Sequence, residues 1–352
     1  MPISRNNHYV PQFYLEKWGS NKKIWKYALL VPNENVPMWT SSSIKHTASQ
    51  DNLYVRWYDG VEIDDFEQFF GSEFENKAKQ SIDKAVSGER LSMDDWHNMI
   101  DFVGAQIVRT PAFYQKMRPI IRNAMKQALE ESVEKLQKIE DISVLKAANH
   151  KIQSSFDQEL IPIQYVDEGE SNISGFVDVR FETVEGKSTW LWAMRHLIKE
   201  PLKQLHNHKW SIITTEVPIP TSDDPVICLN YYSENDYNFD GGWMQKGTEI
   251  ICPISPYKIL YTQVGVRHEP RIWYTKDQSA VFKKMIVEHA FREVYAMDQD
   301  PEVCVIRPRI INQELFVTEK REVDGWYQTY IDGESTMLKS KHQIIKNEDN
   351  LE

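Results

Sequence analysis

The chain reads Asn7-His8-Tyr9-Val10-Pro11-Gln12-Phe13-Tyr14-Leu15 near its N-terminus, a stretch that places a histidine, a proline and a glutamine at a predicted helix start. Because proline is preferred at the first helical position, Pro11 is expected there, with the free amides of Gln12 and Phe13 forming an incipient anion site. The helix dipole would disfavour the imidazolium form of His8 and leave a neutral base. The plainer interpretation is that His8 and Gln12 bond the backbone and fix the N-terminal arm on a sheet.

Outward from this motif, hydrophobic spacing predicts three regions within one domain, residues 1–332. Strand-like runs at 22–30 and 52–58 make residues 1–60 a β segment with one short helix. Residues from about 61 to 208 show helical periodicity, and short strands with two helices, at 276–297 and 310–318, follow up to 332. The sequence thus predicts an α+β protein in which a helical insertion separates two β regions that pair into one sheet. Residues 333–352 form a polar tail.

Composition limits the class of protein. With 41% hydrophobic and 26% charged residues, the 352-residue chain is typical of globular proteins. Its three cysteines, Cys228, Cys252 and Cys304, lie in apolar stretches without the spacing of a zinc site, so they are expected in the core. Neither an apolar signal core at the N-terminus nor a run of roughly 18 apolar residues is found, which predicts a cytoplasmic protein without membrane contact.

The formal net charge of -11 disfavours broad binding to duplex DNA, which requires many contacts from lysine and arginine to phosphates. The first thirty residues depart from this balance, because their basic side chains outnumber the acidic ones. A local site for RNA or DNA therefore stays open. A long amphipathic arm at 112–140, continued at 142–159, is a candidate element for homo-oligomers.

A second motif, Gln106-Ile107-Val108-Arg109-Thr110-Pro111, lies at the end of a predicted helix that Pro111 should interrupt. Gln106 and Arg109 are three residues apart and therefore share a helix face. The surrounding residues are apolar, and a buried arginine needs a carboxylate or a bound anion. Glu75 on the preceding helix is a candidate partner, either in an internal pair that joins two helices or as part of a functional site.

A third motif is the acidic turn Thr221-Ser222-Asp223-Asp224-Pro225-Val226. Asp223 at the edge of a sheet could ligate a metal or orient a histidine. Serine, aspartate and proline are equally the residues of an ordinary turn. Both interpretations remain open.

These motifs resemble a large family of bacterial and fungal proteins known as domain of unknown function 4238. The first motif resembles the string that opens the family, and the resemblance extends to its Gln-x-x-Arg-Thr-Pro string, a glutamate on the earlier helix and a Ser-Asp-x-Pro string. His289 departs from the pattern, because the family is expected to have asparagine there. The resemblance implies a family and no established activity.

Our leading hypothesis is a phosphodiester-cleaving, nuclease-like effector in bacterial defence or toxin biology. His8 would be the general base or acid, Arg109 would hold the phosphate, and Gln12 and Gln106 would orient it. Glu75 and Asp223 would position His8 or a divalent metal, and the sequence does not identify a cofactor. The alternatives are a non-enzymatic anion-binding sensor or protein-interaction module, and a transferase or hydrolase acting on a small phosphorylated substrate.

Overall fold

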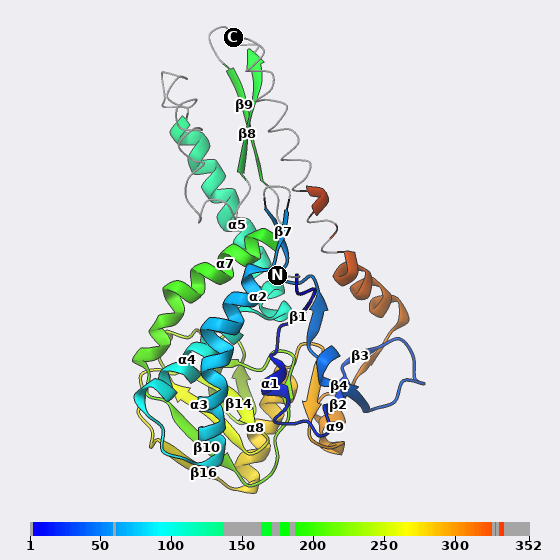
Figure 1. The fold of residues 1–352 in the computed structure, drawn as a ribbon, viewed down its shortest axis with the longest axis vertical. Coiled ribbons are helices and arrows are strands. Elements are labelled where there is room, and N and C mark those ends of the chain that lie inside the picture. The colour runs from blue at the N-terminus through cyan, green and yellow to red at the C-terminus, as the bar shows by residue number, and fades with distance from the viewer. Residues whose placement is uncertain are drawn as a thin grey trace. The chain divides into compact units, whose positions relative to one another are not determined.

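The computed structural model describes residues 3–58, 61–136, 163–170, 177–183, 187–325, 328 and 331–333. The chain divides into two compact units, which are described separately (Figure 1). The first unit contains Met1–Val55, Asp64–Tyr114 and His196–Arg321, and the second contains Arg56–Ile63, Gln115–Arg195 and Glu322–Glu352. Among the described residues, no helix combines the length and apolar character needed to cross a membrane.

The N-terminal motif begins as a strand and ends in one helical turn. Strand β1 (Asn6–His8) pairs antiparallel with β5 (Ser49–Asp51), and the helix α1 (Gln12–Leu15) follows. Pro11 has an extended ψ of 145° and precedes the helix, so the prediction that it is the first helical residue was wrong. Pairing with β5 keeps the first residues of the motif extended. The extended conformation continues to Pro11, and the helix begins at the next residue.

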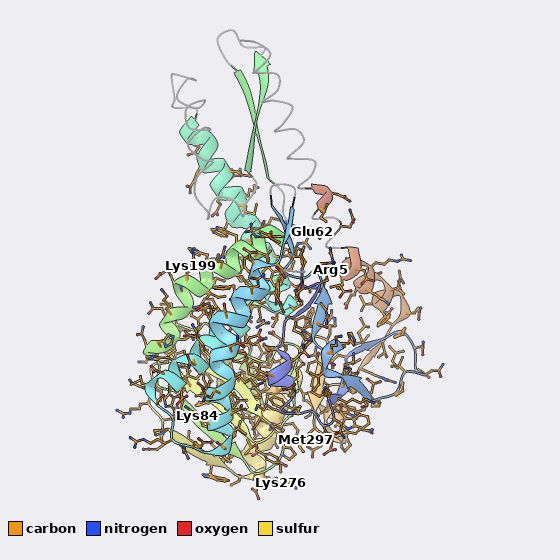
Figure 2. The ribbon with its side chains drawn as sticks, viewed as in Figure 1. Arg5, Glu62, Lys84, Lys199, Lys276 and Met297 are labelled. Atoms are coloured by element: carbon orange, nitrogen blue, oxygen red, sulfur yellow. The ribbon has the colours of Figure 1, made fainter. Side chains whose placement is uncertain are left out.

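The helices of the first unit follow the predicted periodicity closely. Their bounds are α2 (Asp65–Phe70), a π-helical turn η2 (Gly71–Glu75), α3 (Asn76–Ser87), α4 (Met93–Val108) and a 3-10 segment η4 (Pro201–Asn207). Ser92 and Asp95 form the capping box that starts α4, and Lys84, labelled in Figure 2, donates to Asp95 at 2.9 Å. Pro111 starts the next helix, α5 (Pro111–Leu136), which confirms the predicted interruption.

A six-stranded sheet lies in the C-terminal part of the first unit, with strand order β13-β12-β14-β15-β10-β16. Its strands are β10 (Ser211–Thr215), β12 (Ile227–Ser233), β13 (Asp236–Asn238), β14 (Glu249–Ser255), β15 (Lys258–Gln263) and β16 (Arg271–Tyr274). Helix α8 (Lys276–His289) packs Phe282, Met285 and Ile286 against isoleucines of this sheet, including Ile213 and Ile251. The burial of these side chains forms an apolar core on this sheet.

A second sheet joins the two ends of the chain, as the α+β prediction required. Its order is β11-β17-β2-β4, formed by β11 (Thr221–Ser222), β17 (Glu293–Ala296), β2 (Lys23–Ala28) and β4 (Thr40–Ser43). The N- and C-terminal regions thus pair in this four-stranded sheet, while the remaining C-terminal strands form the six-stranded one. The α+β class is confirmed. The N-terminal and C-terminal β regions share the four-stranded sheet, but other strands of both regions lie outside it.

Short elements complete the first unit. They are η1 (Ile44–His46), α9 (Pro301–Ile306) and the parallel pair of β3 (Leu30–Val31) and β18 (Ile310–Ile311). A helix begins at residue 313 and continues past Arg321, where this unit ends. The helix predicted at 276–297 ends at His289, because the residues after it turn into β17. The three cysteines are free, with Cys252 buried and the other two partly buried.

The second unit contains two antiparallel hairpins. One joins β6 (Arg56–Tyr58) to β7 (Val61–Ile63), and the other joins β8 (Ile163–Glu170) to β9 (Val177–Thr183). Helix α7 (Lys187–Lys199) begins in this unit. Strands β8 and β9 lie in the region 61–208, for which helical periodicity had been predicted. The predicted helix at 142–159 and nearly all of the polar tail lie outside the described residues.

Candidate functional site

The end of α4 holds the N-terminal motif through two side chains. Arg109 is fully buried; its Nη1 donates to Oε1 of Glu75 at 2.8 Å and its Nη2 donates to the backbone carbonyl of His8. The guanidinium lies over the ring of Phe70, 4.6 Å from the centroid. Three residues earlier, Nε2 of Gln106 donates to the backbone carbonyl of Tyr9 at 2.7 Å. The predicted face of Gln106 and Arg109 therefore exists, and it contacts both Glu75 and the motif.

His8 lies on β1 with 6% of its surface exposed. Burial lowers the pKa of its imidazole, an effect opposed by the nearby carbonyls of Ile44 and Lys45. A neutral histidine was predicted, but its main cause is burial, since α1 is only one turn long and has little dipole of its own. The imidazole is therefore in the state that accepts a proton near neutral pH.

Glu67 joins this group, although the sequence did not single it out. Its Oε2 accepts a hydrogen bond from Nδ2 of Asn7 at 3.3 Å, and the Oδ1 of Asn7 accepts one from the backbone amide of Tyr54 at 3.1 Å. Burial raises the pKa of Glu67 to about 7; the charge of Glu75 adds to this shift, while that of Arg109 opposes it. Glu67 is thus a carboxyl group that exchanges its proton near neutral pH.

Tyr54 ties the group to the end of α4, because its hydroxyl donates to the backbone carbonyl of Arg109 at 2.8 Å. Burial raises the pKa of this phenol, so it stays protonated and acts as a donor. We call the set His8, Glu67, Glu75, Gln106 and Arg109, with Asn7 and Tyr54, the Arg109 cluster.

The two glutamates of the Arg109 cluster lie on one helical segment, residues 65–87. This segment consists of α2, the π-helical turn Gly71–Glu75 and α3. Such turns occur mostly as single insertions in α-helices and are frequent at functional sites. Here the turn ends at Glu75, the residue that pairs with Arg109. Both glutamates are partly exposed, so the cluster reaches solvent on this helical run.

Three buried atoms of the Arg109 cluster have no hydrogen-bond partner among the described residues. They are Nε2 of His8, Oε1 of Gln106 and Nε of Arg109. Buried polar atoms in folded proteins nearly always have a partner, so each such atom requires an explanation. Nε of Arg109 is a donor, Oε1 of Gln106 is an acceptor, and Nε2 of His8 is an imidazole nitrogen. A small polar ligand or an ordered water could form hydrogen bonds with these atoms.

Asp223 and Gln12 lie outside this cluster. The carboxylate of Asp223 accepts the backbone amides of Phe291 at 2.8 Å and Arg292 at 2.7 Å, which fixes the turn between α8 and β17. Burial, followed by the charge of Glu293, raises the pKa of Asp223 to about 7. Gln12 is exposed on α1, and within the described part of the chain no hydrogen bond connects either residue to Arg109 or His8. The contacts of Asp223 are those of a side chain that fixes a turn.

The acidic turn nevertheless meets the second motif through the next residue. Oγ1 of Thr110 donates to Oδ1 of Asp224 at 2.9 Å and accepts the amide of Phe113, which starts α5. His289 lies on the other side of Asp224, with Nδ1 3.1 Å from its backbone carbonyl. This contact gives His289 a structural position at the end of α8.

Within the ranges that the structure describes, no three histidine, cysteine, aspartate or glutamate side chains gather closely enough to hold a metal ion. The charge of Glu75 raises the pKa of His8, against the effect of burial.

Comparisons with known proteins place the chain in a family. Neither the curated proteins nor the solved structures contained a match to it. A family model described as "Protein of unknown function (DUF4238)" matches residues 6–300, which include every residue of the Arg109 cluster. Because the match covers most of the chain, the protein belongs to the DUF4238 family.

Proposed function

We propose that the protein is an enzyme that cleaves a phosphodiester, and that the Arg109 cluster is its catalytic site. The observation that carries the proposal is the set of three unpartnered buried atoms on His8, Gln106 and Arg109. They converge on a cluster that also holds a neutral histidine and a carboxyl group with a pKa of about 7. Titratable groups perturbed in this way gather preferentially at functional sites.

The proposed reaction uses the two proton-exchanging groups in complementary roles. Nε2 of His8 accepts a proton from the attacking water or hydroxyl as that oxygen bonds to phosphorus. The protonated carboxyl of Glu67 gives its proton to the leaving oxygen as the bond between phosphorus and that oxygen breaks. A pKa of about 7 allows both protonation states of Glu67 to be populated near neutral pH.

Arg109 has a narrower role here than the sequence indicated. Its terminal nitrogens donate to Glu75 and to the carbonyl of His8, whereas Nε has no partner among the described residues and is the nitrogen that we assign to a phosphate oxygen. Its main contribution is to position His8 relative to the glutamates. Gln106 supplies a free acceptor, Oε1, that can orient a hydroxyl of the substrate. Gln12 and Asp223 take no part in this scheme.

The second candidate function is a non-enzymatic anion sensor or interaction module. The observation that favours it is the burial of Arg109 in its pair with Glu75, which is what an internal structural contact requires. In this case an anion binds beside Nε of Arg109 without turnover. Binding without cleavage distinguishes the two functions.

The test compares two conservative variants with the wild type on single-stranded RNA, single-stranded DNA and bis(p-nitrophenyl) phosphate. We expect His8→Gln and Glu67→Gln to lower kcat/KM by on the order of 100-fold or more. The matched control is His46→Gln, which changes an exposed histidine near β5 and should keep full activity. Melting temperatures confirm that every variant is folded.

A wild type that binds inorganic phosphate but cleaves none of these substrates supports the sensor instead. Equal cleavage by the wild type and both variants would refute the assignment of the site. The proposed setting, bacterial defence or toxin biology, is tested by expression in bacteria. We expect the wild type to arrest growth and His8→Gln to permit it, with equal amounts of both proteins.

A further inference from the structure

A row of three side chains crosses the edge of the six-stranded sheet, where β16 is the outermost strand. Trp273 on β16 and Lys258 on β15 are both paired with Thr214 on β10, the strand between them. Side chains alternate between the two faces of a sheet, and the adjacent Ile213 and Ile259 pack in the core with α8. The row therefore lies on the face turned away from α8.

Trp273 presents a large flat ring to solvent. Its side chain is 76% exposed, and Nζ of Lys258 lies 5.8 Å from the centroid of its ring. Arg271, two residues earlier on β16, is on the same face of the sheet and is also exposed. We call Thr214, Lys258, Arg271 and Trp273 the Trp273 patch.

The two cations of the Trp273 patch have neutral partners. Nζ of Lys258 donates to Oγ1 of Thr214 at 2.7 Å, and Nη2 of Arg271 donates to the backbone carbonyl of Glu89 at 2.6 Å. Among the described residues, no carboxylate forms an ion pair with either side chain. Burial lowers the pKa of Lys258, and the charge of Arg271 lowers it further, so two positive charges lie close together.

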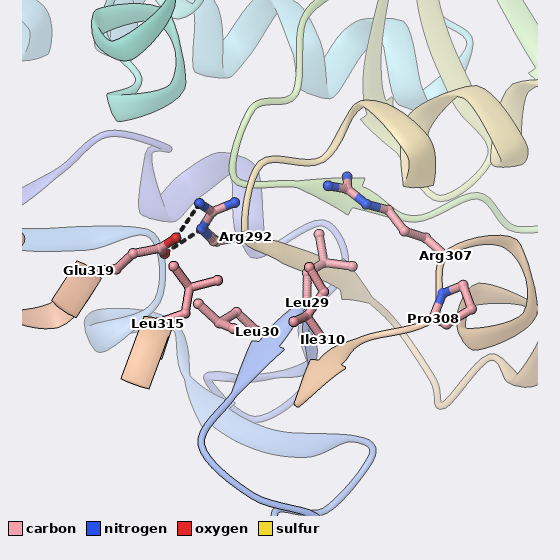
Figure 3. Close-up of a pocket in the computed structure, with 8 residues that line it drawn as sticks. All are labelled: Leu29, Leu30, Arg292, Arg307, Pro308, Ile310, Leu315 and Glu319. Carbon is pink, nitrogen blue, oxygen red and sulfur yellow. Dashed lines mark hydrogen bonds and ion pairs between the residues drawn. The ribbon is translucent and has the colours of Figure 1, made fainter. Parts of the chain in front are cut away.

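Other basic side chains of this unit are paired with carboxylates. Nε and Nη2 of Arg292 donate to the two oxygens of Glu319 at 2.7 and 2.6 Å, as Figure 3 shows. In the basic N-terminal segment, Lys26 pairs with Glu293 at 2.8 Å. An anion from another molecule would have to displace a carboxylate of the protein at these positions. At the Trp273 patch it can approach both cations without such competition.

The combination of an exposed indole with two cations fits single-stranded nucleic acid. Each nucleotide of a single strand presents a phosphate, which lysine and arginine bind, and an unpaired base, which stacks on aromatic side chains. A duplex keeps its bases stacked inside the helix and could use only the cations. An acidic peptide offers carboxylates to the cations but no base to the indole.

We propose that the Trp273 patch binds single-stranded nucleic acid, with a base stacked on Trp273 and neighbouring phosphates on Lys258 and Arg271. As a surface that holds the substrate, the patch rests on the proposed phosphodiester cleavage at the Arg109 cluster. It names single-stranded RNA or DNA as the substrate class of that reaction. Binding at the patch does not itself require turnover.

The test measures binding of fluorescein-labelled oligothymidylate and oligouridylate of about 12 nucleotides to the full chain, by fluorescence anisotropy. Every protein carries His8→Gln so that the probe stays intact. We expect Trp273→Ala to weaken binding roughly tenfold or more, and Trp273→Phe, which keeps an aromatic ring, to weaken it less. The matched control is Tyr232→Ala, which removes a 66% exposed ring from β12 and should leave binding unchanged. The probe that binds more tightly identifies RNA or DNA as the preferred strand.

The contribution of the cations is measured through the salt dependence of binding. On single strands, each phosphate contact adds about 0.7 to the slope of log K against log salt concentration, measured between about 50 and 200 mM NaCl. Lys258→Gln should make this slope shallower by about that amount. Trp273→Ala removes no charge and should leave the slope unchanged. Lys246→Gln, which changes an exposed lysine before β14, is the control for charge and should also leave it unchanged.

Three results would overturn the proposal. They are no binding of either oligonucleotide, equal binding with and without Trp273→Ala, and displacement of the probe by oligoglutamate at equal concentration, which would make the patch a general anion surface. The proposed function is tested separately, by wild-type cleavage of bis(p-nitrophenyl) phosphate, a substrate without a nucleobase. If the wild type cleaves nothing but Trp273→Ala loses oligonucleotide binding, the patch is confirmed and the cleavage is refuted.

Discussion

The carboxylate of Glu75 lies 2.8 Å from Nη1 of Arg109, whose side chain is only 1% exposed. This pair connects the π-helical turn to the end of α4, and the other arm of the same guanidinium reaches the carbonyl of His8. One side chain therefore joins three segments that are far apart in the sequence. The N-terminal motif and the second motif depend on each other through it.

Loss of Arg109 should be among the most damaging single changes in this protein. Arg109→Ala removes one partner of a buried ion pair and leaves Glu75 and the carbonyl of His8 without a donor. We expect the free energy of unfolding to fall by about 3–5 kcal/mol, measured by urea denaturation. Lys77→Ala, which breaks the exposed pair with Glu73, is the control and should cost no more than about 0.5 kcal/mol. If Arg109→Ala and Lys77→Ala lowered the free energy of unfolding equally, the buried pair would contribute no more to stability than the exposed one.

Glu67 should make stability depend on pH in a direction opposite to that of most carboxylates. Its pKa is about 7 in the folded protein against an ordinary value of 4.5, so the folded state binds the proton more tightly than the unfolded state. The stabilisation is complete below the unfolded pKa and disappears as pH rises through the folded pKa. Glu67→Gln stays neutral throughout, so its stability relative to the wild type should rise between about pH 4.5 and 7 and then level off.

This difference is measured by denaturation of both proteins in the same buffers. Effects of other titrating groups, such as His8 and Asp223, are common to the two proteins and cancel in the comparison. A difference that stays flat from pH 4.5 to 7 would contradict the raised pKa of Glu67.

The part of the site that could be predicted from sequence rests on local geometry and on one energetic rule. The three-residue spacing of Gln106 and Arg109, together with the need of a buried arginine for a carboxylate, led to Glu75. Glu67 was missed because the intervening π-helical turn changes which side chains share a face. Periodicity in a sequence does not record such a turn, and neither motif points to Glu67.

Strand pairing was harder to predict for a related reason. Residues 293–296 were expected to continue a helix, yet they form β17 between β2 and β11. Their conformation is determined by partners more than 60 residues away, including the Tyr27–Val294 and Ser222–Val294 pairs. Local propensity cannot report contacts of this kind.

The N-terminal motif should also contribute to stability through Tyr14. Its buried hydroxyl donates to the carbonyl of Pro253 at 2.6 Å and lies 2.7 Å from Oγ1 of Thr221. Tyr14→Phe keeps the ring but removes both of these buried hydrogen bonds, so we expect a loss of about 1–3 kcal/mol in urea denaturation. Tyr257→Phe is the control, because Tyr257 is exposed, and it should change stability by less than about 0.5 kcal/mol. If Tyr14→Phe and Tyr257→Phe both changed stability by less than about 0.5 kcal/mol, the hydroxyl of Tyr14 would not be a stabilising contact.

Asp223 provides the sharpest separation between a structural and a catalytic carboxylate. Its two oxygens each accept a backbone amide, and an asparagine at this position can accept only one while presenting an NH₂ group to the other. We therefore expect Asp223→Asn to lower the free energy of unfolding by about 1–3 kcal/mol. If the turn is its only role, phosphodiesterase activity per folded molecule stays at the wild-type level, whereas Glu67→Gln loses it. Because Asp223 also fixes the backbone of Arg292, the same variant should loosen the pairing with Glu319 and speed trypsin cleavage at Lys320. If Asp223→Asn protein is stably folded but inactive, Asp223 has the catalytic role that the sequence predicted.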